Sequence, residues 1–334
     1  RGDDLRKSKT RAEQIKMMKS DPFDIVIVGG GPVGVELAAE IVLHKPSTKI
    51  ILVHGGTTLL PQFSEEVSTH CERWLRRQNV EVLLGHRRLS IIDLEGGAQP
   101  MASGDGQTLV TFNGEIYNFP ALRSDLEGRG HVFQTNSDTE VILGAWREWG
   151  ADCVDHLEGM FAFVIWDRRH RTLLAARDRT GIKPLYIGQS DGAVVFSSTL
   201  APFFELPGFD LQVDREAIRD VLVYDYVPAP RSMLRAVRKL RPGHCVLWKT
   251  SEPFPESRSF WEVPPCDDGP VEFQELVERC ESALDRSIRR QMMSDVPLGA
   301  FLSGGIDSSL IVASMARFSD EPVTTFSVSF QSGS

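Results

Sequence analysis

The sequence is poor in cysteine, in basic residues relative to acidic ones, and in long hydrophobic runs. Its 334 residues include five cysteines, none of which forms a C-x-x-C pair, so neither a zinc site nor a disulfide framework is indicated. The sequence contains no charge-free run of 18 apolar residues, so a membrane span is not indicated. Acidic residues outnumber basic ones by 46 to 37, which disfavours binding of nucleic-acid phosphates over a broad surface. The chain starts at Arg1 without a signal-peptide pattern, and we expect a cytoplasmic protein.

Length and charge distribution divide the chain. At ~150 residues per domain the length suggests about two domains. Residues 1–85 carry 12 basic and 11 acidic residues, and the remaining 25 basic and 35 acidic residues follow. A proline-rich stretch over 253–268 is the best later linker. The predicted pieces are a polar lead-in helix and three domains or partial domains, over 1–20, 21–85, 86–265 and 266–334.

The first piece has the pattern of a dinucleotide-binding unit. Strands are predicted at 23–28, 49–53 and 80–84, with helices between them, and a G-x-G-x-x-G motif follows the first strand. Such glycines allow a tight turn and close approach of a pyrophosphate to a helix N-terminus. The motif glycines are Gly29, Gly31 and Gly34. The acidic residue expected about 20 positions later to bind ribose is missing, since His54 stands there; this leaves NADH and NADPH both open.

The string IVIVGGGPVGVELAAEI, with Glu36 after the glycines, resembles the NAD(P)H-binding module of FAD-dependent oxidoreductases related to apoptosis-inducing factor. The likeness covers residues 21–85 and does not include the FAD-binding portion of that family. Without a flavin there is no hydride acceptor. The resemblance therefore implies NAD(P)H binding by this unit, with no FAD site and no reductase activity.

The second piece alternates strands with turns and helices. We expect a strand at 109–112 ending in a turn at Asn113-Gly114. A helix is predicted at 119–128, and Ser137 with Glu140 forms a capping-box pattern at the start of another. The apolar runs 160–167 and 172–176 are expected to pair as a hairpin.

The strings GHRRLSIIDLEGGAQPM, VTFNGEIYNF, TNSDTEVIL and AARDRTGIKPLYIG resemble the glutaminase domain of glutamine-dependent asparagine synthetases. That family is an N-terminal-nucleophile amidotransferase with an αββα sandwich, which would be incomplete here. The resemblance implies that Arg88 holds the glutamine carboxylate, and that Asn113 and Gly114 form the oxyanion hole. Asn113, Glu115 and Asp138 would contact the substrate, the two acids binding its α-amino group. Taken singly, these residues fit an ion pair, a turn and a helix cap.

The nucleophile of that family, a cysteine whose own α-amino group is the base, has no counterpart here. Position 1 is arginine, and all five cysteines are internal, namely Cys71, Cys153, Cys245, Cys266 and Cys280. Cys71 lies among arginines, which could lower the pKa of its thiol, but an ordinary helix cysteine is the simpler interpretation. We expect that this chain does not hydrolyse glutamine.

The third piece has a helix at 273–293, a strand at 296–302, the sequence SGGIDSS and a further helix and strand. This order resembles the PP-loop of ATP pyrophosphatases, where small residues let backbone N–H groups and hydroxyls surround a pyrophosphate. The resemblance implies that Leu302 contacts adenine and that Asp307 lies near Mg²⁺. The implied ATP site comprises Leu302, Ser303, Gly304, Gly305, Asp307, Ser308 and Ser309.

The expected fold is multidomain α/β and α+β: a partial Rossmann-like βαβαβ unit, an incomplete glutaminase sandwich, and the start of an ATP pyrophosphatase domain. The resemblance implies an ATP-dependent ligase of amino-acid biosynthesis that moves the glutamine amide nitrogen to aspartate. Its partners would be small molecules, with no nucleic acid, no membrane and no metal held by protein ligands. Two alternatives stay open, an NAD(P)H-binding fragment of a flavin enzyme, and a non-catalytic composite of two families joined near Gly85-His86.

Overall fold

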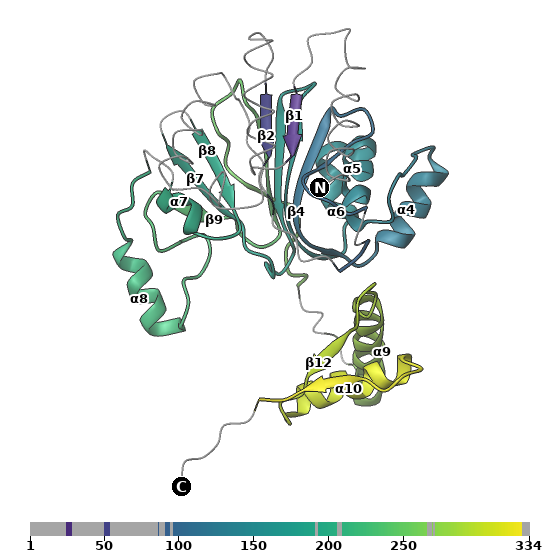
Figure 1. Ribbon diagram of the computed structural model, residues 1–334. Coiled ribbons are helices and arrows are strands. Elements are labelled where there is room, and N and C mark those ends of the chain that lie inside the picture. Colours follow the sequence, from purple (N-terminus) through teal and green to yellow (C-terminus); the bar gives the residue numbers. More distant parts are fainter. Residues whose placement is uncertain are drawn as a thin grey trace, which may run out of the picture. The chain divides into compact units, whose positions relative to one another are not determined.

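The chain divides into two compact units, residues 1–88 and 89–334. The computed structural model describes residues 25–28, 50–53, 86, 91–93, 96–190, 193–205, 209–265, 269 and 271–328. Figure 1 shows these parts as coloured ribbons. No helix among them is both long and apolar enough to cross a lipid bilayer.

The first unit contains a parallel strand pair. Strands β1 (Ile25–Val28) and β2 (Ile50–Val53) pair in register from Ile25 opposite Ile50 to Val28 opposite Val53. Both strands were predicted, and parallel pairing requires a crossover connection of the kind that a βαβ unit has. The predicted lead-in helix at 1–20, the third strand at 80–84 and the three motif glycines lie outside the described residues.

The centre of the second unit is a six-stranded antiparallel sheet in the order β11-β10-β6-β5-β4-β3. The predicted hairpin of residues 160–167 and 172–176 is confirmed, since β5 and β6 pair from Asp167 opposite Thr172 onward. In chain order the strands are β3 (Met101–Ala102), β4 (Thr108–Ile116), β5 (Gly159–Asp167), β6 (Thr172–Arg177), β10 (His244–Lys249) and β11 (Arg258–Ser259).

Helices cover one face of this sheet (Figure 1). They are α4 (Phe119–Gly128), α5 (Asp138–Trp149), the 3₁₀ turn η1 (Gly150–Asp152) and α6 (Cys153–His156). The predicted helix at 119–128 is confirmed. Apolar side chains that alternate along β4 and β5 pack against Val141, Ile142 and Ala145 of α5, and all of these are fully buried. This core fixes which side chains of β4 face the helices and which face away.

A second, three-stranded antiparallel sheet has the order β8-β7-β9 and lies on the other side of the large sheet in Figure 1. A small core of Phe203, Leu234 and Val237 packs against it. The elements of this region are β7 (Tyr186–Ser190), β8 (Ala193–Ser197), α7 (Ala201–Glu205), α8 (Arg215–Tyr224) and β9 (Val237–Lys239).

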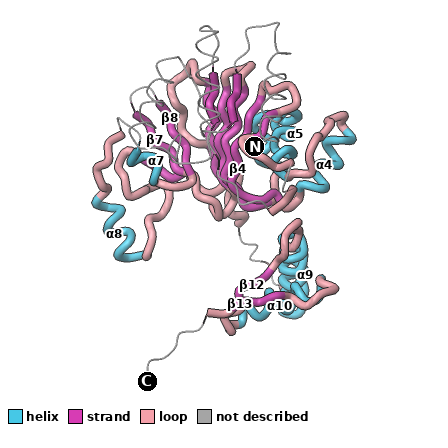
Figure 2. Tube along the Cα trace, viewed as in Figure 1, coloured by secondary structure: helices cyan, strands magenta, loops and turns pink. Residues whose placement is uncertain are grey.

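The C-terminal part contains a second parallel pair, β12 (Gly299–Phe301) and β13 (Thr324–Phe326), with Gly299 opposite Thr324. Helix α9 (Phe273–Gln291) precedes the pair and α10 (Ile306–Phe318) connects its strands. Figure 2 shows this strand, helix and strand order, which confirms the predicted elements with shorter strands. Asp285 of α9 accepts hydrogen bonds from Ser314 (2.5 Å) and Arg317 (2.6 Å) of α10, which join the two helices.

Candidate active site

The prediction of a turn at Asn113-Gly114 is wrong, because both residues lie inside β4. Strand β4 pairs with β5 over its whole length, with Asn113 opposite Ala162 and Gly114 opposite Phe161. An Asn-Gly dipeptide favours a hairpin when the chain folds back on itself. Here a partner strand of equal length pairs with every residue from Thr108 to Ile116, and this long pairing outweighs the local preference.

The backbone of Gly114 does not bond to β5. Both backbone polar groups of its partner Phe161 face away from β4. The Phe161 N–H donates to Asp178 Oδ2 (3.2 Å), and the Phe161 carbonyl accepts from the Asp178 N–H (2.8 Å). Gly114 and Phe161 therefore form the non-hydrogen-bonded type of antiparallel pair. The N–H of Gly114 consequently points away from β5, toward the outer edge of β4.

The two N–H groups that flank Gly114 on this edge are both occupied. The Phe112 N–H donates to Gln99 Oε1 (2.6 Å), and the Ile116 N–H donates to Asp138 Oδ2 (3.1 Å). Strand β3 pairs only with Leu109 and Val110, so it stops short of this stretch. Among the described residues, none accepts a hydrogen bond from Gly114 N–H. This edge therefore presents one backbone donor that a ligand could use.

Glycine is required at position 114 for two reasons. Its φ of +156° is rarely adopted by other residues. A Cβ atom there would also lie 2.0 Å from the Met160 carbonyl oxygen and 2.7 Å from Phe161 Cα. The two strands thus approach each other so closely that a shift in β5 would be transmitted to the Gly114 amide.

Asn113 and Glu115 project from the face of β4 opposite the helices. Phe112 and Ile116 are buried in the core with α5, and side chains alternate along a strand. Both Asn113 and Glu115 are half-buried. Burial raises the pKa of the Glu115 carboxyl, the negative charge of Asp138 raises it further, and Lys183 acts in the opposite direction. Glu115 and Asp138 are thus close enough for the charge of Asp138 to disfavour ionisation of Glu115.

Asp138 is held at the first turn of α5. Ser137 is the N-cap, and its Oγ accepts a hydrogen bond from the Thr139 N–H (3.2 Å). The predicted capping box is confirmed at Ser137 but not at Glu140, whose carboxylate accepts instead from the Thr135 N–H (2.7 Å). The Asp138 side chain is buried and bonds to the β4 backbone, so helix and strand are fixed relative to each other at this point.

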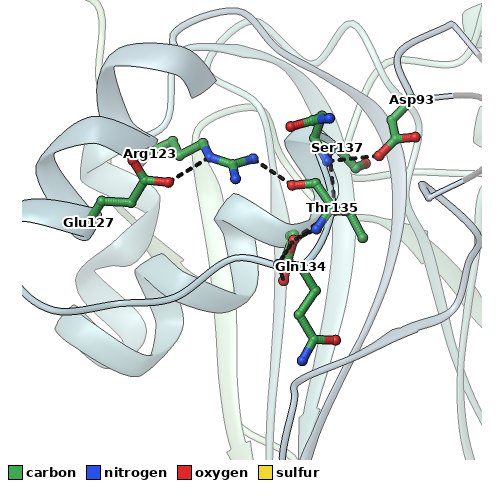
Figure 3. A network of polar contacts seen from close by, with 8 residues as sticks. Asp93, Arg123, Glu127, Gln134, Thr135 and Ser137 are labelled. Atoms are coloured by element: carbon green, nitrogen blue, oxygen red, sulfur yellow. Dashed lines mark hydrogen bonds and ion pairs between the residues drawn. The ribbon is translucent and has the colours of Figure 1, made fainter.

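A network of polar contacts holds the loop that enters α5 (Figure 3). Asp93 accepts from the Asn136 N–H (2.8 Å). From the other side, Arg123 donates to the Thr135 carbonyl (2.5 Å) and pairs with Glu127 (2.9 Å). Since the loop is bonded from both sides, the position of Asp138 is set by residues distributed over α4, the loop and the segment before β3.

Sequence reasoning missed three residues of this region, Tyr117, Arg177 and Asp178. The pKa of Tyr117 is raised to about 12 by burial and then by the negative charges of Glu115 and Asp178. Arg177 and Asp178 are both buried where β6 ends. A charged Arg-Asp pair at the end of the otherwise apolar strand TLLAAR was the available signal, because buried charges are rare unless they are bonded.

The SGGIDSS sequence spans the loop after β12 and the first residues of α10, which begins at Ile306. Gly304 has a positive φ of +82°. The Ser308 Oγ lies 3.0 Å from the Ser303 Oγ and accepts from the Ser303 N–H (3.3 Å), which closes the loop. Gly305 is the N-cap of α10, without a side-chain cap. The exposed N-terminal turn of a 13-residue helix, with Asp307 in it, therefore follows the loop.

Other predicted site residues lie outside the described residues or away from this site. Gly29, Gly31, Gly34 and Arg88 are not described. Cys153 and Cys245 are buried in the core on the helix side, and burial raises the pKa of both thiols. Cys280 is exposed on α9. No cluster of metal-ligating side chains occurs in the described part of the chain.

Three family models match the chain. Residues 71–261 match the glutamine amidotransferase domain, and residues 279–334 match asparagine synthase. Residues 4–118 match pyridine nucleotide-disulphide oxidoreductase. The first and third matches overlap over residues 71–118, which include β4.

Curated relatives are glutamine-hydrolysing asparagine synthetases. Asparagine synthetase 3 of Bacillus subtilis is 37% identical over 258 residues, covering 75% of this chain and 41% of its own length. Asparagine synthetase 1 of the same organism is 39% identical over 249 residues, which cover 74% of this chain and 38% of that protein. The chain thus spans about two fifths of these relatives.

Among solved structures, the glutamine phosphoribosylpyrophosphate amidotransferase of B. subtilis matches with a TM-score of 0.36 and 17% identity, over 69% of this chain and 48% of that chain. The assignment rests on the family model that covers more than half of the 334 residues. The chain belongs to the glutamine amidotransferase domain family, and part of an asparagine synthase domain follows that domain.

Proposed function

We propose that this protein binds glutamine at the edge of β4 and that it belongs to an enzyme which transfers the glutamine amide nitrogen to ATP-activated aspartate. The observation that carries the proposal is the backbone donor of Gly114, which lacks an acceptor among the described residues and lies beside Asn113. A hole for a developing oxyanion needs such fixed donors, because they require no reorganisation during the reaction. The match to asparagine synthetases supports aspartate and ATP as the other substrates.

In this proposal each residue has one role. The Asn113 amide and the Gly114 N–H stabilise the oxygen of the tetrahedral intermediate. Glu115 and Asp138 bind the α-amino group of glutamine. The mutual repulsion of two carboxylates supports the amino-group role, since a cation placed between them relieves that repulsion. Ligand binding should therefore lower the raised pKa of Glu115.

The loop after β12 is proposed to bind the ATP phosphates. Backbone N–H groups at Gly304 and Gly305, with the Ser303 and Ser308 hydroxyls, provide the small polar surface that a pyrophosphate requires. The exposed N-terminal turn of α10 favours an anion. Leu302 would contact adenine and Ser309 would complete the loop. The single carboxylate of Asp307 fits Mg²⁺, which takes one or two carboxylates and keeps its phosphate and water ligands.

A second candidate function is NAD(P)H binding by residues 21–85. It is favoured by the parallel pairing of β1 and β2 and by the oxidoreductase match over residues 4–118. Quenching of tryptophan fluorescence by NADPH or NADH, abolished by Gly31→Glu, would support it. Because two families meet in one chain, the junction itself is testable: a tryptic peptide of residues 78–87, isolated from source cells, would exclude a composite made by sequence assembly.

The test of the main proposal is isothermal titration of the 334-residue protein with L-glutamine. We expect saturable binding that Asp138→Asn abolishes. Asp105→Asn is the matched control, because Asp105 accepts from Ser103 (2.7 Å) and Gln107 (3.1 Å) in the turn before β4. Equal binding by Asp138→Asn and Asp105→Asn would refute the assignment of the site.

A further inference from the structure

The carboxylate of Asp178 accepts hydrogen bonds from several backbone N–H groups of the segment that follows β6. It is fully buried. Its Oδ1 accepts from the N–H groups of Thr180 (3.2 Å) and Ile182 (2.9 Å), and its Oδ2 accepts from that of Lys183 (2.9 Å). Three N–H groups within residues 180–183 thus converge on one side chain. This segment is thereby wrapped around Asp178.

Arg177 binds the same segment through its carbonyl groups. Its Nε donates to the Lys183 carbonyl and its Nη2 to the Gly181 carbonyl, both at 2.7 Å. Its Nη1 donates to the Leu240 carbonyl, also at 2.7 Å, which ties the segment to the residues before β10. Arg177 and Asp178 together satisfy donors and acceptors of residues 180–183, so the segment is held as one rigid piece.

Asp178 also reaches the proposed oxyanion donor through β5. Its Oδ2 accepts from the Phe161 N–H, and its own N–H donates to the Phe161 carbonyl (2.8 Å). On the other side of β5, Phe161 lies opposite Gly114, in a contact too close to admit a Cβ atom. Gly114, Phe161 and Asp178 therefore form a continuous row of close contacts across three neighbouring chain segments.

We infer that Asp178 is a positioning residue of the glutamine site. It fixes the position of the Gly114 amide through Phe161, and it fixes the position of Lys183 through the 178–183 segment. The inference rests on the proposed function. Asp178 bonds to Phe161, Ile182 and Lys183 and not to Asn113 or Gly114, so it acts through other residues. The electrostatic effect of Lys183 on Glu115 is a second consequence of the same placement.

The test compares Asp178→Asn with Asp167→Asn in the 334-residue protein. Asp167 lies at the opposite end of β5 and accepts from the His170 N–H (3.0 Å) and from the His170 ring (3.0 Å). Both variants remove a buried carboxylate that accepts backbone hydrogen bonds at one end of the β5 and β6 hairpin. In Asp178→Asn the side-chain amide nitrogen cannot accept, so at least one group of backbone donors loses its partner.

Two quantities are measured in each variant, the affinity for L-glutamine by calorimetry and the amide signal of Gly114 in protein labelled with ¹⁵N-glycine. We expect Asp178→Asn to weaken glutamine binding at least tenfold and to shift the Gly114 signal. Asp167→Asn should lower the melting temperature and change neither quantity. If Asp178→Asn reduces affinity no more than Asp167→Asn does, the inference is overturned.

A second variant keeps the inference testable if Asp178→Asn does not fold. Ile182→Pro removes only one donor to Asp178, and the Ile182 side chain is 60% exposed. It should weaken binding about fivefold and shift the Gly114 signal, and an unchanged signal would refute the positioning role. If the unmodified protein does not bind glutamine, the proposed function fails. The Gly114 signal then decides by itself whether Asp178 fixes the position of the Gly114 amide.

Discussion

Gly114→Ala is the substitution for which the structure predicts the largest local conflict. The new methyl group would lie 2.0 Å from the Met160 carbonyl oxygen and 2.7 Å from Phe161 Cα, and both contacts are with backbone. A φ of +156° is also unfavourable for alanine. Since neither contact can be relieved by a side-chain rotation, β4 and β5 must separate at this pair.

The expected destabilisation combines two terms. Backbone strain contributes ~1–3 kcal/mol, and forcing an extra methyl group into a closed contact contributes a further ~1–3 kcal/mol. A combined loss of about 4 kcal/mol lowers the melting temperature by roughly 8–16 °C, at ~2–4 °C per kcal/mol for a domain of this size. Glutamine binding should be lost as well, because the donor edge is displaced.

Thermal unfolding followed by circular dichroism, with calorimetry for glutamine, measures both effects. Gly128→Ala is the matched control, since nothing lies within 4 Å of a Cβ there and Gly128 is the last residue of α4. Alanine in that position should be neutral or stabilising by up to ~1 kcal/mol. A Gly114→Ala protein that melts and binds like Gly128→Ala would refute the close approach of β4 and β5 and its link to the site.

Further predictions concern three residues, Glu115, Tyr117 and Ser137. Because the pKa of Glu115 is raised above 4.5 in the folded protein, ionisation of this carboxyl lowers the stability of the fold as the pH rises through the raised value. Glu115→Gln should therefore increase stability toward urea at pH 7, leave it unchanged below the ordinary pKa of 4.5, and weaken glutamine binding. An equal effect on stability at pH 7 and below pH 4.5 would contradict this. Tyr117→Phe should remove the phenol that ionises near pH 12 from an absorbance titration, and loss of a transition near pH 10 would be inconsistent with its burial. Ser137→Ala should cost ~1 kcal/mol as a lost N-cap, measured by thermal unfolding, and an unchanged melting temperature would argue against the cap.

Local sequence patterns predicted most of the described elements. The hairpin of β5 and β6, the helix α4 and the Ser137 cap each depend on residues close together in the chain. The strand and helix order around SGGIDSS was equally accessible, because small residues between an apolar strand and an apolar helix have few alternatives.

Long-range pairing decided what local patterns could not. Asn113-Gly114 was predicted as a turn because that dipeptide often forms one, but its conformation depends on β5, which lies about 45 residues later in the chain. The roles of Arg177 and Asp178 likewise depend on partners such as Phe161 and Leu240. No pattern within a short window contains those contacts.

The sequence by itself determined the composition of the candidate site, since the residue types at Asn113, Glu115 and Asp138 and their family resemblance are visible without coordinates. Only the tertiary structure decided that the Gly114 N–H faces outward and that Asp138 bonds to the β4 backbone. The physical reason is that the direction of a backbone donor in a sheet depends on which neighbour each partner strand bonds to. These bonds join residues far apart in sequence, and here the deciding ones are those between Phe161 and Asp178.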